Sequence, residues 1–209
     1  FGGYRDAVLA RNPDFVEYLK EITLRADGVR SGAVARTEDN MLKITTDGRK
    51  AALDLRLVQP QAPFSYNSKV MRCAENVFHL YMQTRDNRST QLVFCDTSTP
   101  KKEFNMYGEI RHLLVMAGIP EGEIAFVHDA QTDSARLALF RRVQEGEVRV
   151  LLGSTFKLGM GVNVQRKLIA IHHLDVPWRP ADMTQREGRI LRQGNENPEV
   201  YIYRYITEG

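Results

Sequence analysis

The sequence predicts an α/β fold, a parallel sheet with helices on both faces, preceded by a mainly helical N-terminal segment. Most predicted strands are continuous apolar runs, such as QLVFCD at residues 91–96, and such runs are typical of strands that are buried on both faces. Helical patterns alternate with these strands at spacings that suit right-handed crossover connections. The 209 residues are 43% hydrophobic and 26% charged, a composition that supports a core and excludes wholesale disorder.

Two domains are predicted, a helical linker segment at residues 1–67 and the regular α/β domain at residues 68–209. In the linker, Phe15, Leu19 and Ile22 fall at i, i+4 and i+7, which is the spacing of one helix face. A polar stretch then leads to a second helix.

This second helix is predicted at about residues 48–57. Thr46 or Asp47 is expected to cap its start, because the oxygens of these side chains accept hydrogen bonds from the free N–H groups of a first helical turn. Pro60 and Pro63 are expected to end it, since proline cannot continue a helix.

The elements of the α/β domain follow in regular order. They are a helix at 69–83, a strand at 91–96, a helix at 103–117, a strand at 124–128, a helix at 133–145, strands at 148–153 and 168–173, a helix at 180–192 and a strand at 200–206. Ligands of open parallel sheets bind beyond the carboxyl ends of the strands. A site is therefore expected in the loops after Asp96, His128, Gly153 and His173.

Charge and cysteine content exclude several classes of protein. The net charge of +3, from 29 basic and 26 acidic residues, permits a nucleic-acid partner without arguing for one. No apolar run approaches the roughly 20 residues that cross a membrane. Cys73 and Cys95 show no zinc-ligand spacing, so no metal site is expected. The start at Phe1 lacks a signal peptide's pattern, and we expect a cytoplasmic piece of a longer protein.

The loop after Gly153 carries the first chemical pattern. Two hydroxyls, Ser154 and Thr155, follow a predicted strand directly, and Gly159 and Gly161 allow a ligand to approach the backbone closely. Loops of this kind present N–H and O–H donors to phosphate oxygens. A plain strand-to-helix turn uses glycines in the same way, and for this loop alone that interpretation is favoured.

The predicted helix at 180–192 carries the second pattern. Gln185, Gly188, Arg189 and Arg192 fall within an arc of roughly 100° on this helix. Guanidinium groups bind phosphate oxygens in a fork and can stabilise the charge that develops on a transferring phosphoryl group. A solvated basic face is the alternative, but a glycine inside a helix costs about 1 kcal/mol relative to alanine, which favours a function for this face.

These patterns together resemble the second RecA-like lobe of superfamily two helicases, in particular that of Swi/Snf-type double-stranded DNA translocases. The resemblance runs from about residue 68 to 205. The matching positions are Ser154, Thr155, Gly159, Gly161, Asn163 and Gln165 in motif V, then Asp175, Trp178 and Pro180, and Gln185, Arg189, Arg192 and Gly194 in motif VI. Gly188 differs from the Asp usual in the Swi/Snf branch and matches the broader pattern Q-R-x-G-R-x-x-R.

The resemblance implies a role for each matching position. It makes Arg189 and Arg192 arginine fingers on an ATP molecule bound by a partner lobe, with Gln185 near the same cleft. It implies nucleotide-binding roles for Gly159, Gly161, Asn163 and Gly188. It implies contacts to DNA phosphates for Ser154, Thr155 and Lys157, although Phe156, Lys157 and Leu158 differ from the small or basic residues usual there.

Two elements of a complete ATPase are absent from the sequence. No G-x-x-x-x-G-K-[ST] loop occurs, and no acidic D-E-x-H-like box follows a strand. ATP and Mg²⁺ are therefore expected on an N-terminal RecA-like lobe of the same polypeptide, and the fragment alone is expected to be inactive and to hold no cofactor. Residues 39–57 resemble the inter-lobe region of mobile-element proteins that join translocases to methylases, which implies a fused methylase as a further partner.

The expected function is that of the C-terminal lobe of an ATP-dependent helicase or translocase acting on double-stranded DNA. One alternative is a catalytically inactive nucleic-acid-binding or scaffolding lobe. Another is a self-contained small-molecule enzyme, which is disfavoured because no nucleophile–base pair or complete cofactor fingerprint is present. Three residues have structural expectations only: Trp178 packs against the Asp175 loop, and of His172 and His173 one is buried and the other lies at the sheet end.

Overall fold

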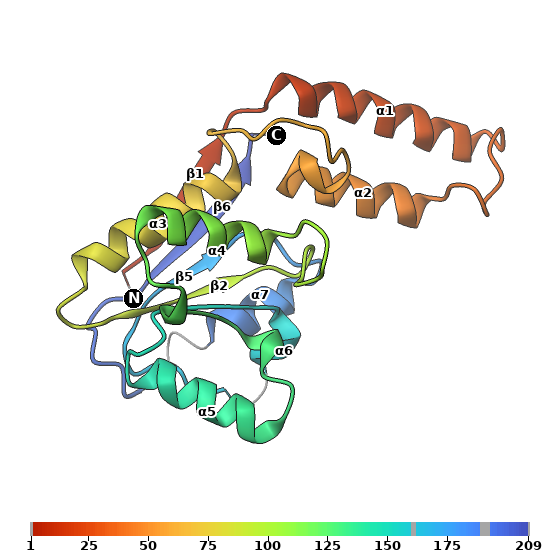
Figure 1. Cartoon of the computed structure of the whole chain (residues 1–209). Coiled ribbons are helices and arrows are strands. Elements are labelled where there is room, and N and C mark those ends of the chain that lie inside the picture. Colours follow the sequence, from red (N-terminus) through yellow and green to blue (C-terminus); the bar gives the residue numbers. More distant parts are fainter. Residues whose placement is uncertain (1, 160–161, 189–192, 209) are drawn as a thin grey trace.

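The structure, a computed structural model, describes residues 2–159, 162–188 and 193–208, and it confirms the α/β fold. All strand pairings in its six-stranded sheet are parallel, and the strand order is β1-β6-β5-β2-β4-β3 (Figure 1). The strands are β1 (Tyr4–Leu9), β2 (Thr90–Phe94), β3 (Ile124–Phe126), β4 (Val150–Gly153), β5 (Leu168–His173) and β6 (Tyr201–Thr207).

Helices cover both faces of this sheet (Figure 1). The helices of the described chain are α1 (Pro13–Arg30), α2 (Met41–Leu53), α3 (Lys69–Gln83), α4 (Met106–Ala117), α5 (Asp133–Gln144), α6 (Thr155–Gly159) and α7 (Pro180–Glu187), with short 3-10 turns at Leu55–Leu57, Glu121–Glu123 and Val127–Asp129. Of these, α1 and α2 lie beyond the end of the sheet. Ser68, Asn105 and Thr132 cap α3, α4 and α5 by accepting hydrogen bonds from first-turn N–H groups. These caps explain why the three helices begin close to their predicted starts.

Two hydrophobic cores lie on opposite faces of the sheet. Val93 of β2 packs in one core with apolar side chains of α3 and α4. Leu92 and Phe94, its neighbours in the same strand, pack in the other core with side chains of α5 and α6. Because successive side chains of a strand point to opposite faces, a strand buried on both sides is mostly apolar, as β2 is from Leu92 to Phe94, after the buried polar residues Thr90 and Gln91.

The N-terminal segment contains one strand that the sequence did not predict. Strand β1 pairs in parallel with β6 at the edge of the sheet, and most of its residues are exposed or half-buried. Its sequence, YRDAVL, has only a short apolar run after Asp6, and pairing with β6 stabilises it as a strand. Strand β1 therefore belongs to the sheet, although it lies before residue 67, the predicted end of the linker segment. The domain boundary itself stays a prediction.

Helices α1 and α2 form a hairpin that extends from the carboxyl edge of the sheet (Figure 1). The predicted start of the second helix was wrong, since α2 begins at Met41 and its cap is Asn40, whose side chain accepts a hydrogen bond from the N–H of Lys43. Thr46 lies inside the helix and donates its hydroxyl hydrogen to the Leu42 carbonyl. The cap therefore lies nearly two helical turns earlier than the expected one.

A buried polar chain crosses the middle of the sheet. His172 is fully buried, with Nδ1 2.8 Å from the Tyr205 hydroxyl and Nε2 2.7 Å from Gln91 Oε1. Burial, followed by the nearby His173, lowers the pKa of His172 to about 3. His173 is the last residue of β5 and so lies at the sheet end, as expected, and it is fully buried as well.

We expect His172 to make the stability of the fold depend on pH. The unfolded chain takes up this proton near pH 6.5, whereas the folded protein stays neutral down to about pH 3. The contribution is complete above pH 6.5 and is lost as the pH falls, by up to about 1.4 kcal/mol per pH unit. Denaturant unfolding at pH 7.5, 6 and 5 should show a shallower loss for His172→Gln than for the wild type. His79→Gln, a change at an exposed position of α3, is the control, and equal slopes for wild type and His172→Gln would contradict the prediction.

Candidate functional site

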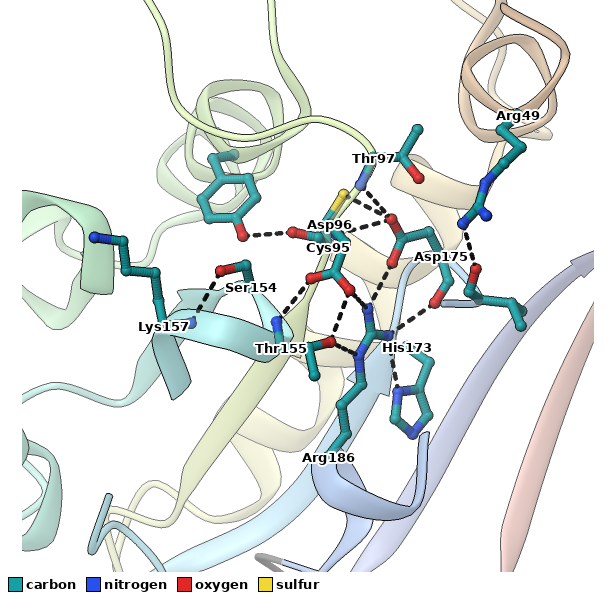
Figure 2. A network of polar contacts seen from close by, with 12 residues as sticks. Arg49, Cys95, Asp96, Thr97, Ser154, Thr155, Lys157, His173, Asp175 and Arg186 are labelled. Carbon is teal, nitrogen blue, oxygen red and sulfur yellow. Dashed lines mark hydrogen bonds and ion pairs between the residues drawn. The ribbon is translucent and has the colours of Figure 1, made fainter. Parts of the chain in front are cut away.

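The polar side chains of the expected site meet at the carboxyl ends of β2, β4 and β5, around the guanidinium of Arg186 (Figure 2). Arg186 is 1% exposed. Its five N–H donors all have acceptors within 3.3 Å: Thr155 Oγ1, the Asp175 carbonyl, His173 Nδ1, Asp96 Oδ2 and Asp175 Oδ1. A fully buried guanidinium needs this complete set of partners, because any unpaired N–H would add to the cost of removing the charge from water.

Asp96 joins the end of β2 to the start of α6. Its Oδ1 accepts a hydrogen bond from the backbone N–H of Thr155 at 2.7 Å, and its Oδ2 accepts one from the Thr155 hydroxyl at 2.7 Å. The same Oδ2 lies 2.9 Å from Nη2 of Arg186. One carboxylate thereby holds the first turn of the helix that follows Gly153.

Asp175 is the second carboxylate on Arg186, and it closes the loop after β2. Its Oδ2 accepts the N–H groups of Asp96 and Thr97 at 2.8 and 2.6 Å, while Oδ1 lies 3.0 Å from Arg186 Nη2. Two carboxylates and one guanidinium thus lie together with little access to water. In such a group the hydrogen bonds fix the geometry, and removing Arg186 would leave two carboxylates without their shared counter-charge.

His173 completes the network from the side of β5. Burial, and then the positive charge of Arg186, lower the pKa of His173 to about 3, so the ring is neutral. Its Nδ1 lies 3.3 Å from Arg186 Nη1 and accepts that hydrogen bond, which places the ring proton on Nε2. Nε2 in turn lies 3.3 Å from Glu187 Oε1.

The residues predicted to contact DNA lie beside this network. Ser154 and Thr155 are 9% and 7% exposed, and the Ser154 hydroxyl accepts the backbone N–H of Lys157. Both the N–H and the hydroxyl of Thr155 are held by Asp96, so this residue is committed to internal hydrogen bonds here. Phe156 is 82% exposed, and Lys157 is half-buried. Their contact with DNA stays a prediction.

Two consecutive residues of motif VI, both on helix α7, differ in their exposure to solvent. Gln185, which was expected on the functional face, is exposed, and Arg186, for which no role was predicted, is buried. Gly188 is exposed and follows the helix end, where its N–H donates to the Thr184 carbonyl at 2.8 Å. The predicted helix continued to residue 192, but residues 189–192 lie outside the described part of the chain, and so do the two predicted finger residues, Arg189 and Arg192.

The predicted nucleotide-binding glycines are placed in part. Gly159 is the last residue of α6, and Asn163 is exposed in the segment that leads to β5. Gly161 lies outside the described residues. The structure therefore confirms the strand-end location of this loop and leaves its ligand as a prediction.

Sequence reasoning missed the two residues at the centre of the site, Asp96 and Arg186. The signal for Asp96 was its place directly after a buried strand, in a loop that was singled out for search. Arg186 stood inside the pattern Q-R-x-G-R-x-x-R, but only the fold shows that it points inward while Gln185 points outward.

Trp178 was expected to pack against the Asp175 loop, and 66% of it is exposed. The guanidinium of Arg49, from α2, lies 4.0 Å from the centre of its ring. The same Arg49 donates from Nη2 to the Val176 carbonyl at 2.7 Å, as Figure 2 shows. These contacts connect the N-terminal hairpin to the loop that precedes α7.

Metal-ligand clusters and membrane-spanning helices are both absent from the described residues. Within residues 2–159, 162–188 and 193–208, no three His, Cys, Asp or Glu side chains lie where they could share a metal ion. No helix in that part of the chain is both long and apolar enough to cross a membrane.

An all-parallel sheet with a hydroxyl–glycine segment and an arginine-bearing helix at its carboxyl edge defines a RecA-like helicase lobe. The chain matches the helicase conserved C-terminal domain over residues 70–194, and it belongs to that family.

Similar solved structures agree with this assignment of the fold. The SWI2/SNF2 ATPase core of Sulfolobus solfataricus in complex with dsDNA has a TM-score of 0.66 at 16% identity, and the match covers 99% of this chain and 41% of that one. The C-terminal domain of a SWI2/SNF2 ATPase from the same organism has a TM-score of 0.63 at 13% identity, covering 99% and 79%.

One curated relative matches a short part of the sequence. The Defense against restriction protein B of Escherichia phage P1 is 36% identical over 66 residues, which is 32% of this chain. The match spans 3% of the length of that relative.

Proposed function

We propose that the chain is the C-terminal RecA-like lobe of an ATP-dependent translocase that moves along double-stranded DNA and shares its ATP site with an N-terminal lobe. The observation that carries the proposal is the orientation of α7. Buried Arg186 fixes the helix on three strand ends, while Gln185 and Gly188 are exposed at the carboxyl edge of the sheet. Arg189 and Arg192 follow directly in the sequence.

In this proposal ATP and Mg²⁺ are held mainly by the partner lobe. Arg189 and Arg192 stabilise the negative charge that develops as the terminal phosphoryl group leaves, and the exposed Gln185 lies at the same cleft. Closure of the two lobes brings these side chains to the nucleotide. The helicase family and the fold that the chain shares with SWI2/SNF2 ATPases support this arrangement.

DNA is contacted through its phosphates, at the end of β4. The Ser154 hydroxyl accepts one internal hydrogen bond and still has a hydrogen to donate to a phosphate oxygen. Lys157 supplies a positive charge one turn further along α6. Thr155 contributes a contact only if its hydrogen bonds to Asp96 are exchanged.

The experiment that tests the proposal compares the 209-residue chain alone with the same chain joined to a lobe that carries the phosphate-binding loop. ATP hydrolysis is measured with and without duplex DNA. The chain alone should show none, and the joined protein should hydrolyse ATP faster when duplex DNA is present. Turnover by the chain alone contradicts the shared site. DNA binding without turnover by the joined protein would favour the inactive scaffolding lobe.

We expect Lys157→Ala to weaken duplex binding by the joined protein about three- to tenfold at 100 mM salt, because one phosphate contact is lost. The slope of log affinity against log salt should fall by about one. Fluorescence anisotropy between 50 and 200 mM salt measures both quantities. Lys20→Ala, at an exposed lysine of α1, is the control. An unchanged slope for Lys157→Ala would show that Lys157 does not bind a phosphate.

A further inference from the structure

The buried guanidinium of Arg186 has more partners than the anchoring of one helix requires. An apolar side chain would attach α7 to the sheet without the cost of moving a charge out of water. Arg186 instead joins residues that follow three different strands: Asp96 after β2, Thr155 after β4 and Asp175 after β5. The position of α7 is thereby tied to all three strand ends at once.

The next residue of α7 is held as well. Glu187 Oε2 accepts a hydrogen bond from the Tyr4 hydroxyl of β1 at 2.8 Å, and its Oε1 lies 3.3 Å from Nε2 of His173. His173 also accepts from Arg186, so the two consecutive residues share one neighbour. Glu187 is thus tied to β1 by one hydrogen bond, and Arg186 to three strand ends, directly before Gly188 and the predicted arginine fingers.

The same network reaches the predicted DNA contacts. The hydroxyl of Thr155 receives a hydrogen bond from Arg186 Nε and donates one to Asp96, so a shift of α6 changes the acceptors available to Arg186. Thr155 begins the short helix that also carries Lys157. A movement at the DNA-binding end of β4 is therefore transmitted to α7 through one guanidinium.

We infer that Arg186 is a positioning residue for ATP hydrolysis, which places Arg189 and Arg192 against the nucleotide and couples them to the DNA-binding turn of α6. This inference rests on the proposed function. Lysine cannot replace arginine here, because one ammonium group cannot make the forked contacts to Thr155, Asp96 and Asp175 together.

The test uses Arg186→Lys in the joined protein, with turnover counted per folded molecule from circular dichroism. The kcat of DNA-stimulated hydrolysis should fall at least about tenfold, while the KM for ATP and the Kd for duplex DNA stay within about threefold. Arg141→Lys, an equal change at an exposed position of α5, should leave all three unchanged. If Arg186→Lys does not fold, Asp175→Asn keeps the side-chain shape, removes one charge from the network and carries the same expectation.

A double-mutant cycle with Arg192→Ala separates positioning from stability. If Arg186 acts through Arg192, the two changes are not additive. The kcat of the double variant should then be within about twofold of the kcat of Arg192→Ala alone. If Arg192→Ala lowers turnover but a folded Arg186→Lys protein keeps the wild-type kcat, the inference is wrong and the proposed function stands. If Arg192→Ala itself has no effect, the proposed function fails and the inference fails with it.

Discussion

Replacing Arg192 with Ala in the joined protein is expected to lower the kcat of DNA-stimulated ATP hydrolysis by about 10³-fold, the largest effect on activity that we expect from a single change. An arginine finger acts on charge that is present in the transition state and not in bound ATP, and its removal typically costs 10³ to 10⁵ in rate. The KM for ATP should change far less than kcat. Steady-state hydrolysis over a range of ATP concentrations separates the two.

Arg179→Ala is the matched control for Arg192→Ala. Arg179 is exposed and immediately precedes the first residue of α7, so its loss removes one positive charge from the same helix without touching the predicted finger positions. Its turnover should stay within about twofold of the wild type, as expected for an exposed side chain. Near wild-type kcat in Arg192→Ala would show that the finger assignment is wrong.

Asp175→Ala is expected to have the largest effect on stability, lowering the free energy of unfolding by about 3–5 kcal/mol. The change leaves the N–H groups of Asp96 and Thr97 without their acceptor and takes one of two carboxylates from buried Arg186. For a domain of this size the melting temperature should fall by roughly 10 °C. Denaturant unfolding and calorimetry of the 209-residue chain measure the loss.

Asp86→Ala provides the comparison for this loss. Asp86 lies on the surface, with its side chain 97% exposed, and such changes usually alter stability by less than about 0.5 kcal/mol. Asp175→Asn should fall between the two, because its amide oxygen can still accept a hydrogen bond. If Asp175→Ala were as stable as Asp86→Ala, the network around Arg186 would contribute nothing to the fold.

The sheet was predictable because its central strands are buried on both faces. Strand β5 has the predicted bounds, β4 lies within its predicted range, and β2 begins one residue before its predicted start and ends two residues before its predicted end. Helices α3, α4 and α5 were found since their side-chain caps lie next to apolar periodic runs. These signals are local, and each can be read from a window of about ten residues.

Strand β1 and the start of α2 were missed for different reasons. Strand β1 exists because its backbone pairs with β6, about 200 residues away in the sequence, and a local pattern does not encode a distant partner. Helix α2 begins at Met41, and its cap Asn40 accepts a hydrogen bond from the N–H of Lys43, three residues further along the chain. This signal is local, and the prediction placed the cap at Thr46 or Asp47 instead.

The sequence by itself determined the order of the elements, the helicase family and the segments in which the chemistry lies, because apolar runs and motif spacing are properties of the chain. Only the tertiary structure decided that Arg186 turns inward and Gln185 outward, that Thr155 is held by Asp96, and that Trp178 is exposed beneath Arg49. The rotation of a helix about its axis depends on which neighbours its side chains meet. For α7 those neighbours are the ends of three strands that come together only when the sheet has formed.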